Sequence, residues 1–248
     1  MQFRFESATI TVNMTDKAAL LAEIASRFSA QQGFALATIN LDHLVKLRAN
    51  PAFQTAYAAQ DLIVADGNPI VWLSRLAGNP VKLVPGADMV LPLAELAAKA
   101  GVGVALVGST EAVLADAAKH LMQQVPKLVV TLCHAPPMGF DPESADAAAI
   151  FSEMRARNVG LCFVALSAPK QEIFAARGRT LAPQIGFASI GAGLDFLAGD
   201  QTRAPLWVRK LALEWLWRAI SNPRRLIPRY LACIAILPAQ IKAALAQR

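Results

Sequence analysis

From residue 34 onward, the chain alternates short apolar runs with longer segments of helical periodicity. Continuous apolar runs are typical of strands buried on both faces of a sheet, and strands that alternate with helices form mostly parallel sheets. The sequence therefore predicts an α/β fold: a mostly parallel, Rossmann-like sheet with helices on both faces. The six expected strands are residues 34–39, 62–66, 103–108, 128–133, 161–166 and 186–191.

Two of the intervening segments carry helix-start signals. Thr110 is the expected N-cap of a helix that runs to residue 125. Pro142, followed by acidic residues, is expected to open a helix that runs to residue 157.

The composition excludes a disordered chain and suggests no export. The 248 residues are 55% hydrophobic and 17% charged, enough to bury a sizeable core. Charges run through the first twenty residues, which lack the apolar region of a signal peptide, so we expect a cytoplasmic protein. Cys133, Cys162 and Cys233 lie in apolar runs without metal-ligand spacing, which predicts buried free thiols.

Positive charge is concentrated at the end of the chain. Residues 201–248 hold nine Lys or Arg and one acidic residue, a net charge of +8, whereas residues 1–200 hold 15 basic and 17 acidic residues, a net charge of −2. We therefore divide the chain at residue 200 and expect an anionic partner for the basic end. No stretch reaches the about 20 apolar residues of a spanning helix; residues 230–241 come nearest but contain Pro238.

The basic end is also rich in aromatic residues. Trp207, Leu211 and Trp215 recur every four residues, which predicts one amphipathic helical face. Trp and Tyr favour the membrane interface, and Arg and Lys contact anionic headgroups. The alternatives are a helical pair that packs on the body with a solvated basic face, and a nucleic-acid-binding tail. The interleaved Trp and Leu residues fit lipid better than nucleic acid.

Polar and glycine residues follow the expected strands. Ligands of open parallel sheets bind beyond the carboxyl ends of the strands, so the chemistry should lie there. The strand-end segments are Thr38–Asn40, Asp66–Asn68, Gly108–Thr110, Ser167–Glu172 and Gly191–Asp195.

Asp66 has two interpretations. As a helix N-cap it would be unremarkable. As a carboxylate leaving a hydrophobic strand, it could serve as a general base, because desolvation raises the pKa of a carboxyl group.

Three other strand ends have residues suited to a nucleotide or a sugar, each with a structural alternative. Gly108 and Ser109 could present backbone N–H groups to a diphosphate, or form a plain tight turn. Lys170 could neutralise a phosphate and Gln171 could bind sugar hydroxyls, or both could belong to an ordinary helix start with Pro169 in its first turn. Asp195 follows a glycine-rich turn and could accept from a ribose, or lie in a flexible loop.

The chain has no Asp-X-Asp pair of the kind that holds a divalent metal in many nucleotide-sugar enzymes. The charge of a diphosphate would then be balanced by Lys, Arg and helix termini. We expect no metal and no cofactor. His43, His120 and His134 are scattered and receive no role.

Five motifs in register resemble one family. They are TIN at 38–40, ADG at 65–67, APKQE at 168–172, GAGLDFLAG at 191–199 and RAP…EWLWR…NPRR…RY in the tail. Over residues 10–232 the chain is similar to the WecG/TagA/CpsF glycosyltransferases (family 26). The resemblance implies a metal-independent, inverting transfer from a UDP-sugar to a polyprenyl-diphosphate-linked sugar. It also implies a C-terminal appendage, here residues 201–248, that contacts the inner membrane surface and helps close the site of the catalytic domain, residues 1–200.

The resemblance also implies residue roles. Asp66 falls on the general base, Thr38, Asn40 and Gln171 on sugar-contacting positions, and Asp195 on a nucleotide-contacting one. The full expected substrate-binding set is Thr38, Asn40, Gly67, Asn68, Gly108, Ser109, Pro169, Lys170, Gln171, Glu172 and Asp195. The residues expected at the lipid diphosphate are Arg203, Arg218, Arg225 and Arg229.

The chain departs from the family pattern at two places. Ser167 stands where the family has Gly, and Leu83-Val84 stands where the family has an Arg before PGAD. The first is expected to alter the backbone approach to the donor, and the second leaves the donor open among N-acetylmannosamine, its uronic acid and glucose. The alternative function is a membrane-peripheral nucleotide-binding protein without transferase activity. Nucleic acid is not an expected partner, and a homo-oligomer is compatible with the sequence.

Overall fold

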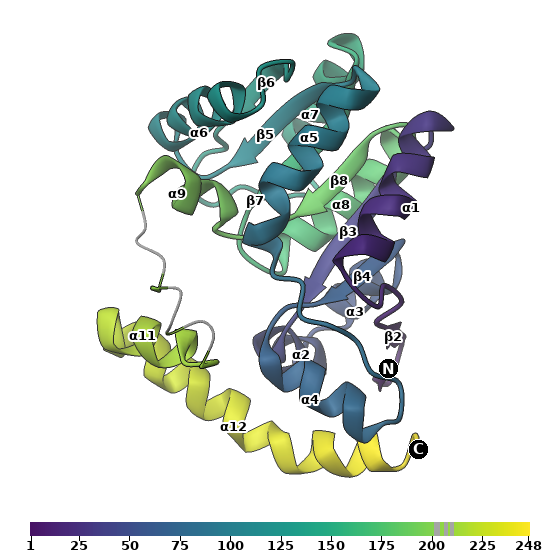
Figure 1. Ribbon diagram of the computed structural model, residues 1–248, viewed down its shortest axis with the longest axis vertical. Coiled ribbons are helices and arrows are strands. Elements are labelled where there is room, and N and C mark those ends of the chain that lie inside the picture. The colour runs from purple at the N-terminus through teal and green to yellow at the C-terminus, as the bar shows by residue number, and fades with distance from the viewer. Residues whose placement is uncertain (201–203, 206–207, 209–210) are drawn as a thin grey trace.

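The computed structural model describes residues 1–200, 204, 205, 208 and 211–248, except for the side chains of residues 218, 221 and 225. Its body is a six-stranded parallel sheet with helices on both faces (Figure 1), so the predicted fold class is confirmed. A separate antiparallel pair, β1 (Gln2–Arg4) and β2 (Thr9–Thr11), precedes it.

The order of the strands in the large sheet is β4-β3-β8-β7-β5-β6. All six predicted strands exist, with ends displaced by a few residues. β8 stops before Gly191, whose positive φ of 55° turns the chain towards the next helix. The bounds are β3 Phe34–Ile39, β4 Leu62–Ala65, β5 Gly103–Gly108, β6 Val130–His134, β7 Val159–Ala165 and β8 Gly186–Ser189.

Alternate residues of each strand enter different hydrophobic clusters. In β5, Val104 and Leu106 pack with one layer of helices, and Ala105 and Val107 pack with the other. The first layer contains α1 (Lys17–Ser29), α5 (Val90–Ala100), α6 (Glu111–Gln124) and α9 (Gly193–Ala198). The second contains α7 (Ala145–Ala156) and α8 (Lys170–Leu181), with α2 (Leu41–Ala49), α3 (Pro51–Ala58) and α4 (Asn68–Leu76) beside β3 and β4.

Two predicted helix starts have different outcomes. Thr110 caps α6 and accepts a hydrogen bond from the amide of Val113 (3.3 Å), as expected. The start at Pro142 is wrong, because Ser144 caps α7 by accepting from the amide of Ala147 (3.2 Å). The hydroxyl of Ser144 satisfies an N-terminal amide of the helix, which the ring of Pro142 cannot do.

Burial is confirmed for two of the three thiols. Cys162 and Cys233 are buried, and all three cysteines are free. Cys133 is exposed, because it lies on β6 at the edge of the sheet, so the prediction of burial is wrong there.

The chain ends in α11 (Glu214–Ser221) and α12 (Pro223–Leu245). These helices lie on the side of the body towards which β3 and β5 point, and α12 packs along α2 and α4 (Figure 1). Gln247 joins the end of the chain to its beginning: the amide of Gln2 donates to Gln247 Oε1 (3.0 Å), and Gln247 Nε2 donates to the carbonyl of Gln2 (2.7 Å).

Two expectations for this region are wrong. Leu211 lies in a turn before α11, so it does not extend one helical face with Trp215, and Trp207 lies outside the described residues. The second expectation was that Pro238 interrupts the apolar stretch, but α12 continues through Pro228 and Pro238 without a break. As a result, Leu226–Leu245 is long and apolar enough to cross a membrane by length and composition, with 17% of its most apolar window buried.

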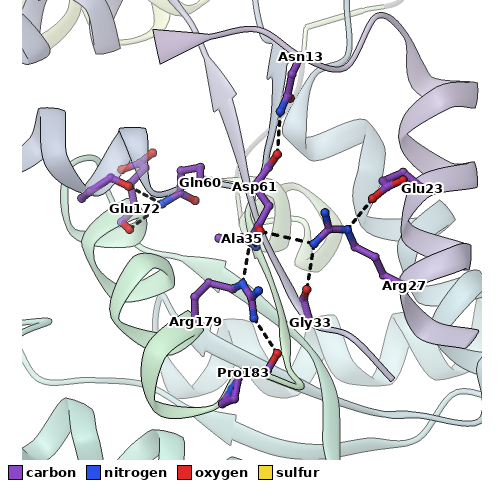
Figure 2. Close-up of polar contacts among 11 residues, drawn as sticks. Asn13, Glu23, Arg27, Gly33, Ala35, Gln60, Asp61, Glu172, Arg179 and Pro183 are labelled. Atoms are coloured by element: carbon purple, nitrogen blue, oxygen red, sulfur yellow. Dashed lines mark hydrogen bonds and ion pairs between the residues drawn. The ribbon is translucent and has the colours of Figure 1, made fainter. Parts of the chain in front are cut away.

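Asp61, which precedes β4, holds several elements together at the amino edge of the sheet. Its carboxylate accepts from the amide of Ala35 (2.8 Å) and from Arg179 Nε (2.8 Å), and it lies 3.5 Å from Arg27 (Figure 2). Asp61 thereby connects α1 and α8 to β3. Beside it, Gln60 Nε2 donates to the carbonyl of Glu172 (3.0 Å) and fixes the first turn of α8.

Candidate active site

The strands are parallel, so the segments that follow them meet at one edge of the sheet. The chain runs from β3 to its outer neighbour β4, which is one edge strand of the sheet. It then crosses to β5, which lies beyond β3, β8 and β7. Such a reversal creates the crevice in which open α/β sheets bind ligands. The expected strand-end residues lie along this edge.

Asp66 is the first residue beyond β4. Its backbone amide donates to the carbonyl of Ile39 (2.8 Å), and its side chain is partly buried. Gly67, with φ 118° and ψ 137°, is the N-cap residue of α4, so the N-cap interpretation of Asp66 is excluded. Asn68 is the first residue of that helix.

Asn40 lies beside this turn. A Cβ atom on Gly67 would be 3.8 Å from the Cβ atom of Asn40. Asn40 caps α2, where its Oδ1 accepts from the amide of His43 (3.1 Å). Because the oxygen is engaged by the helix, the NH₂ group is the part of Asn40 suited to a ligand.

Thr38 is buried beneath a short helical turn, η1 (Gly86–Met89). A Cβ atom on Gly86 would lie 3.2 Å from Thr38 Cγ2 and 3.3 Å from the Cα atom of Ile190. The absence of a side chain at Gly86 thus lets η1 close over the ends of β3 and β8. Leu83 approaches the edge from the same segment, in a parallel bridge with Ala65.

Gln171 connects two of the strand-end loops. Its Oε1 accepts from the amide of Gly191 (3.1 Å), and its Nε2 donates to Glu172 Oε1 (2.7 Å). The side chain is buried. Gln171 therefore fixes the loop after β7 against the loop after β8, a role that the sequence pattern did not suggest.

Glu172 is completely buried, and burial raises the pKa of its carboxyl group to about 7. Its Oε2 has no hydrogen-bond partner among the described residues. His43 Nε2 lies 4.0 Å from Oε1, and His43 Nδ1 lies 3.2 Å from the hydroxyl of Tyr57. Burial lowers the pKa of His43 to about 3, so the imidazole is neutral at pH 7 and the contact with Glu172 is not an ion pair.

The charges of Glu172 and Asp66 both act on Tyr57. Burial raises the pKa of the Tyr57 hydroxyl, and the negative charges of Glu172 and Asp66 raise it further. Asp66, Tyr57 and Glu172 therefore share one electrostatic environment. Neither Tyr57 nor His43 was expected at the site; the only signal in the sequence is that they lie on the two helices that follow Asn40.

Ser109 and Asp195 form a second group, carried by the loops after β5 and β8. The Ser109 hydroxyl donates to Asp195 Oδ1 (2.5 Å). Gly108 lets the end of β5 approach β7 closely, since a Cβ atom there would lie 2.4 Å from the carbonyl oxygen of Ala165. The structure thus brings these three expected residues to one place, with Ser109 engaged by Asp195.

Lys170 begins α8, and its Nζ donates to the carbonyl of Phe140 (2.7 Å). Pro169 follows a cis peptide bond and occupies the N-cap position, so its expected place in the first turn is wrong. The ammonium group of Lys170 therefore holds the loop after β6 at the same edge as the loop after β7.

Only one of the four expected arginines has a described side-chain contact. Arg229 Nε lies 2.7 Å from Asp42 Oδ1. Arg203 lies outside the described residues, as do the side chains of Arg218 on α11 and Arg225 on α12. Asp42 and Lys46, which the sequence did not single out, form an i,i+4 ion pair on α2 (2.9 Å).

An apolar groove of about 370 Å³ lies between α11 and α12. Its walls include Trp215, Ile220, Ile227, Tyr230 and Leu231. Trp215 packs edge-on against Tyr230, with ring centroids 5.9 Å apart. The two terminal helices therefore present an apolar surface to their surroundings.

Within the described ranges, no three His, Cys, Asp or Glu side chains gather in a way that could hold a metal ion.

Comparison with known proteins agrees with the motifs at this edge. The family model for glycosyl transferases of the WecG/TagA/CpsF family matches residues 5–248. A relative from Bacillus spizizenii, N-acetylglucosaminyldiphosphoundecaprenol N-acetyl-beta-D-mannosaminyltransferase, is 26% identical over 210 residues, which cover 82% of this chain and 79% of the relative. The match includes every strand-end segment described above, and the chain therefore belongs to the WecG/TagA/CpsF family of glycosyl transferases.

Proposed function

We propose that this protein transfers a sugar from a UDP-sugar to a polyprenyl-diphosphate-linked saccharide at the inner face of the membrane, in the synthesis of a cell-surface polysaccharide. The relative's name gives it an acceptor of this class, an undecaprenol diphosphate that bears N-acetylglucosamine. The observation that carries the proposal is the position of Asp66 at the carboxyl edge: its amide pairs with Ile39, and the next residue, Gly67, lies close to Asn40.

The proposed reaction is a single in-line displacement. Asp66 takes the proton from a hydroxyl of the acceptor sugar, and the resulting oxygen attacks the anomeric carbon of the α-linked donor. The bond from that carbon to the diphosphate breaks on the opposite face, and UDP leaves. The product is a β-glycoside, so the configuration at the anomeric carbon is inverted.

The leaving diphosphate needs compensating positive charge. In this proposal Lys170, the amino ends of the helices at this edge and an arginine of the tail supply it without a metal ion. Lys170 is anchored to the carbonyl of Phe140, which holds its ammonium group near the start of α8. In the same proposal, the nucleotide binds at the Ser109–Asp195 pair, which lies on the loops after β5 and β8.

The acceptor carries a long apolar chain, which requires a protein surface that meets the membrane. The groove between α11 and α12 and its exposed Leu and Ile residues favour that role for residues 201–248. Interfacial binding of this kind is stronger when apolar residues combine with basic ones, as they do here. We therefore place the protein in the cytoplasm, peripherally bound to the membrane.

The experiment uses the full chain, anionic vesicles that contain a synthetic polyprenyl-diphosphate N-acetylglucosamine, and UDP-sugars of N-acetylmannosamine, N-acetylmannosaminuronic acid and glucose. UDP release and a β-linked disaccharide lipid are expected with one donor and in the presence of EDTA. Binding of UDP without release from any donor would instead support a nucleotide-binding protein. Activity that disappears with EDTA and returns with Mg²⁺ would overturn metal independence alone.

A further inference from the structure

A charged contact between the C-terminal helix and the body lies beside the candidate site. Arg229, on the second turn of α12, forms an ion pair with Asp42 on α2 (2.7 Å). Asp42 is 8% exposed and lies two residues after Asn40. A carboxylate so well buried is unfavourable unless cations compensate its charge, so the position of α12 affects the stability of this end of α2.

Asp42 is shared with a second cation. Lys46 Nζ lies 2.9 Å from Asp42 Oδ2, one helical turn further along α2. The same ammonium group donates a hydrogen bond to the carbonyl of Ala168 (3.1 Å), which belongs to the loop after β7. Lys46 therefore connects the carboxylate that Arg229 contacts to the segment that immediately precedes α8.

The segment held by Lys46 carries the buried pair at the site. Three residues after Ala168, Gln171 binds the amide of Gly191 and the carboxyl group of Glu172. The charges of Lys46 and Asp42 both reach Glu172, where the first lowers and the second raises the pKa. Contacts thus run without interruption from α12 to the loops after β7 and β8.

We propose that Lys46 is a positioning residue that couples the docking of α12 to the active-site loops. When α12 is seated, Arg229 and Lys46 share Asp42, and Lys46 stays extended towards Ala168. When α12 leaves, the buried carboxylate of Asp42 loses one of its two described cations and draws Lys46 towards itself. The hold of Lys46 on Ala168 then weakens, and the Gln171–Gly191 bond loosens. The consequence for donor binding rests on the proposed function, whereas the coupling itself does not.

Amide hydrogen exchange of the full chain tests the coupling without any ligand. Two amides report on the loops: Lys170, which donates to Ser167 (2.9 Å), and Gly191, which donates to Gln171. Arg229→Gln and Lys46→Met are expected to accelerate exchange at both, and Lys46→Arg is expected to restore protection. Arg224→Gln removes an exposed arginine of the same helix and serves as the matched control. Unchanged exchange in both Arg229→Gln and Lys46→Met would overturn the proposal.

A double-mutant cycle on UDP binding tests whether the two residues act through one route. Each single variant is expected to weaken UDP binding by roughly 2- to 30-fold, the usual range for residues of a coupling network. The double variant should lose no more UDP affinity than the more affected single variant, because either change interrupts the same linkage. Losses that multiply would mean that Arg229 and Lys46 act separately. A wild-type protein that binds no UDP would refute the proposed function and leave the exchange experiment as the test of coupling.

Discussion

The backbone amide of Asp66 donates to the carbonyl of Ile39 (2.8 Å), so the strand-like pairing of β3 and β4 continues one residue past the end of β4. This bond fixes the backbone of the carboxylate relative to the central strand of the site. The next residue, Gly67, turns the chain into α4 with a φ of 118°. Asp66 is thus held at the edge of the sheet by its backbone, at the start of the turn that leads into α4.

Substitution of Asp66 by Asn should lower kcat by about 10²- to 10⁴-fold, the usual contribution of a general base. The amide has nearly the same shape but cannot accept the proton of the acceptor hydroxyl. UDP affinity, measured by calorimetry, should stay within about twofold, since the carboxylate acts on the acceptor. Asp116→Asn, on the exposed face of α6, is the control for a lost negative charge. Wild-type turnover in Asp66→Asn would refute the assignment.

Glu172 should make the stability of the protein fall as the pH rises. Its pKa is about 7 when folded and 4.5 ordinarily, so between these values the unfolded chain releases a proton that the folded chain keeps. The free energy of unfolding then decreases by about 1.4 kcal/mol per pH unit across this window. Glu172→Gln removes the titrating group but keeps an oxygen that can accept from Gln171.

Urea unfolding of the wild type and of Glu172→Gln at pH 5, 6, 7 and 8 measures this effect as a difference between the two proteins. His43, whose folded pKa is lowered to about 3, has the opposite effect: it lowers the stability of the protein as the pH falls below 6.5. It is present in both proteins, so its contribution cancels in the difference. Glu95→Gln, at an exposed position of α5, should show the same change of unfolding free energy with pH as the wild type. A constant difference between Glu172→Gln and the wild type would contradict the raised pKa.

Asp61→Asn should reduce the free energy of unfolding by about 2 kcal/mol. The amide oxygen can still accept from Arg179 and the amide of Ala35, but the negative charge between Arg27 and Arg179 is lost and an NH₂ group faces Arg27. These contacts lie at the amino edge of the sheet, so kcat per folded molecule should not change. Asp16→Asn is the matched control: Asp16 pairs with the exposed Lys82, and Asn also caps helices well, so a much smaller change is expected. Equal effects of the two substitutions in urea unfolding would contradict a structural role for Asp61.

Local patterns were enough to predict the sheet and the edge at which the site lies. Continuous apolar runs identified all six strands, because burial on both faces of the inner strands leaves few polar positions in them. Thr110 was identified as a cap for an equally local reason. Where two local signals competed, as at Pro142 and Ser144, the side chain that could satisfy a helix amide prevailed.

Contacts between distant segments could not be predicted in this way. The Asp42–Arg229 ion pair joins α2 to α12, and nothing in either segment indicates its partner. The sequence placed Gln171 at the site, but its bonds to Gly191 and Glu172 depend on how β7 and β8 lie side by side. The expectations for residues 201–248 were wrong for two reasons. The helical periodicity was counted across Leu211, where the chain forms a turn, and Pro238 was expected to interrupt the apolar stretch but does not end α12.

The exposed apolar residues of α11 and α12 should control binding to vesicles. Ile220 is 72% exposed and Leu231 is 61% exposed, and both line the groove between the two helices. Burial of such a side chain in the interface contributes about 1.5–3 kcal/mol, so Ile220→Glu or Leu231→Glu should each reduce partition to anionic vesicles by at least about tenfold. Because these side chains are exposed in the folded protein, thermal unfolding without vesicles should be unchanged.

Val129→Glu is the matched control for this prediction, since Val129 is 58% exposed but lies before β6 on the body. It introduces the same charge at a similar exposure, so any general effect of negative charge on vesicle binding appears in it as well. Transfer to a short-chain, water-soluble acceptor separates membrane binding from catalysis: both helix variants should keep that activity while losing activity on vesicle-bound acceptor. Equal loss of vesicle binding in all three variants would show that net charge, and not the apolar face of α11 and α12, determines the interaction.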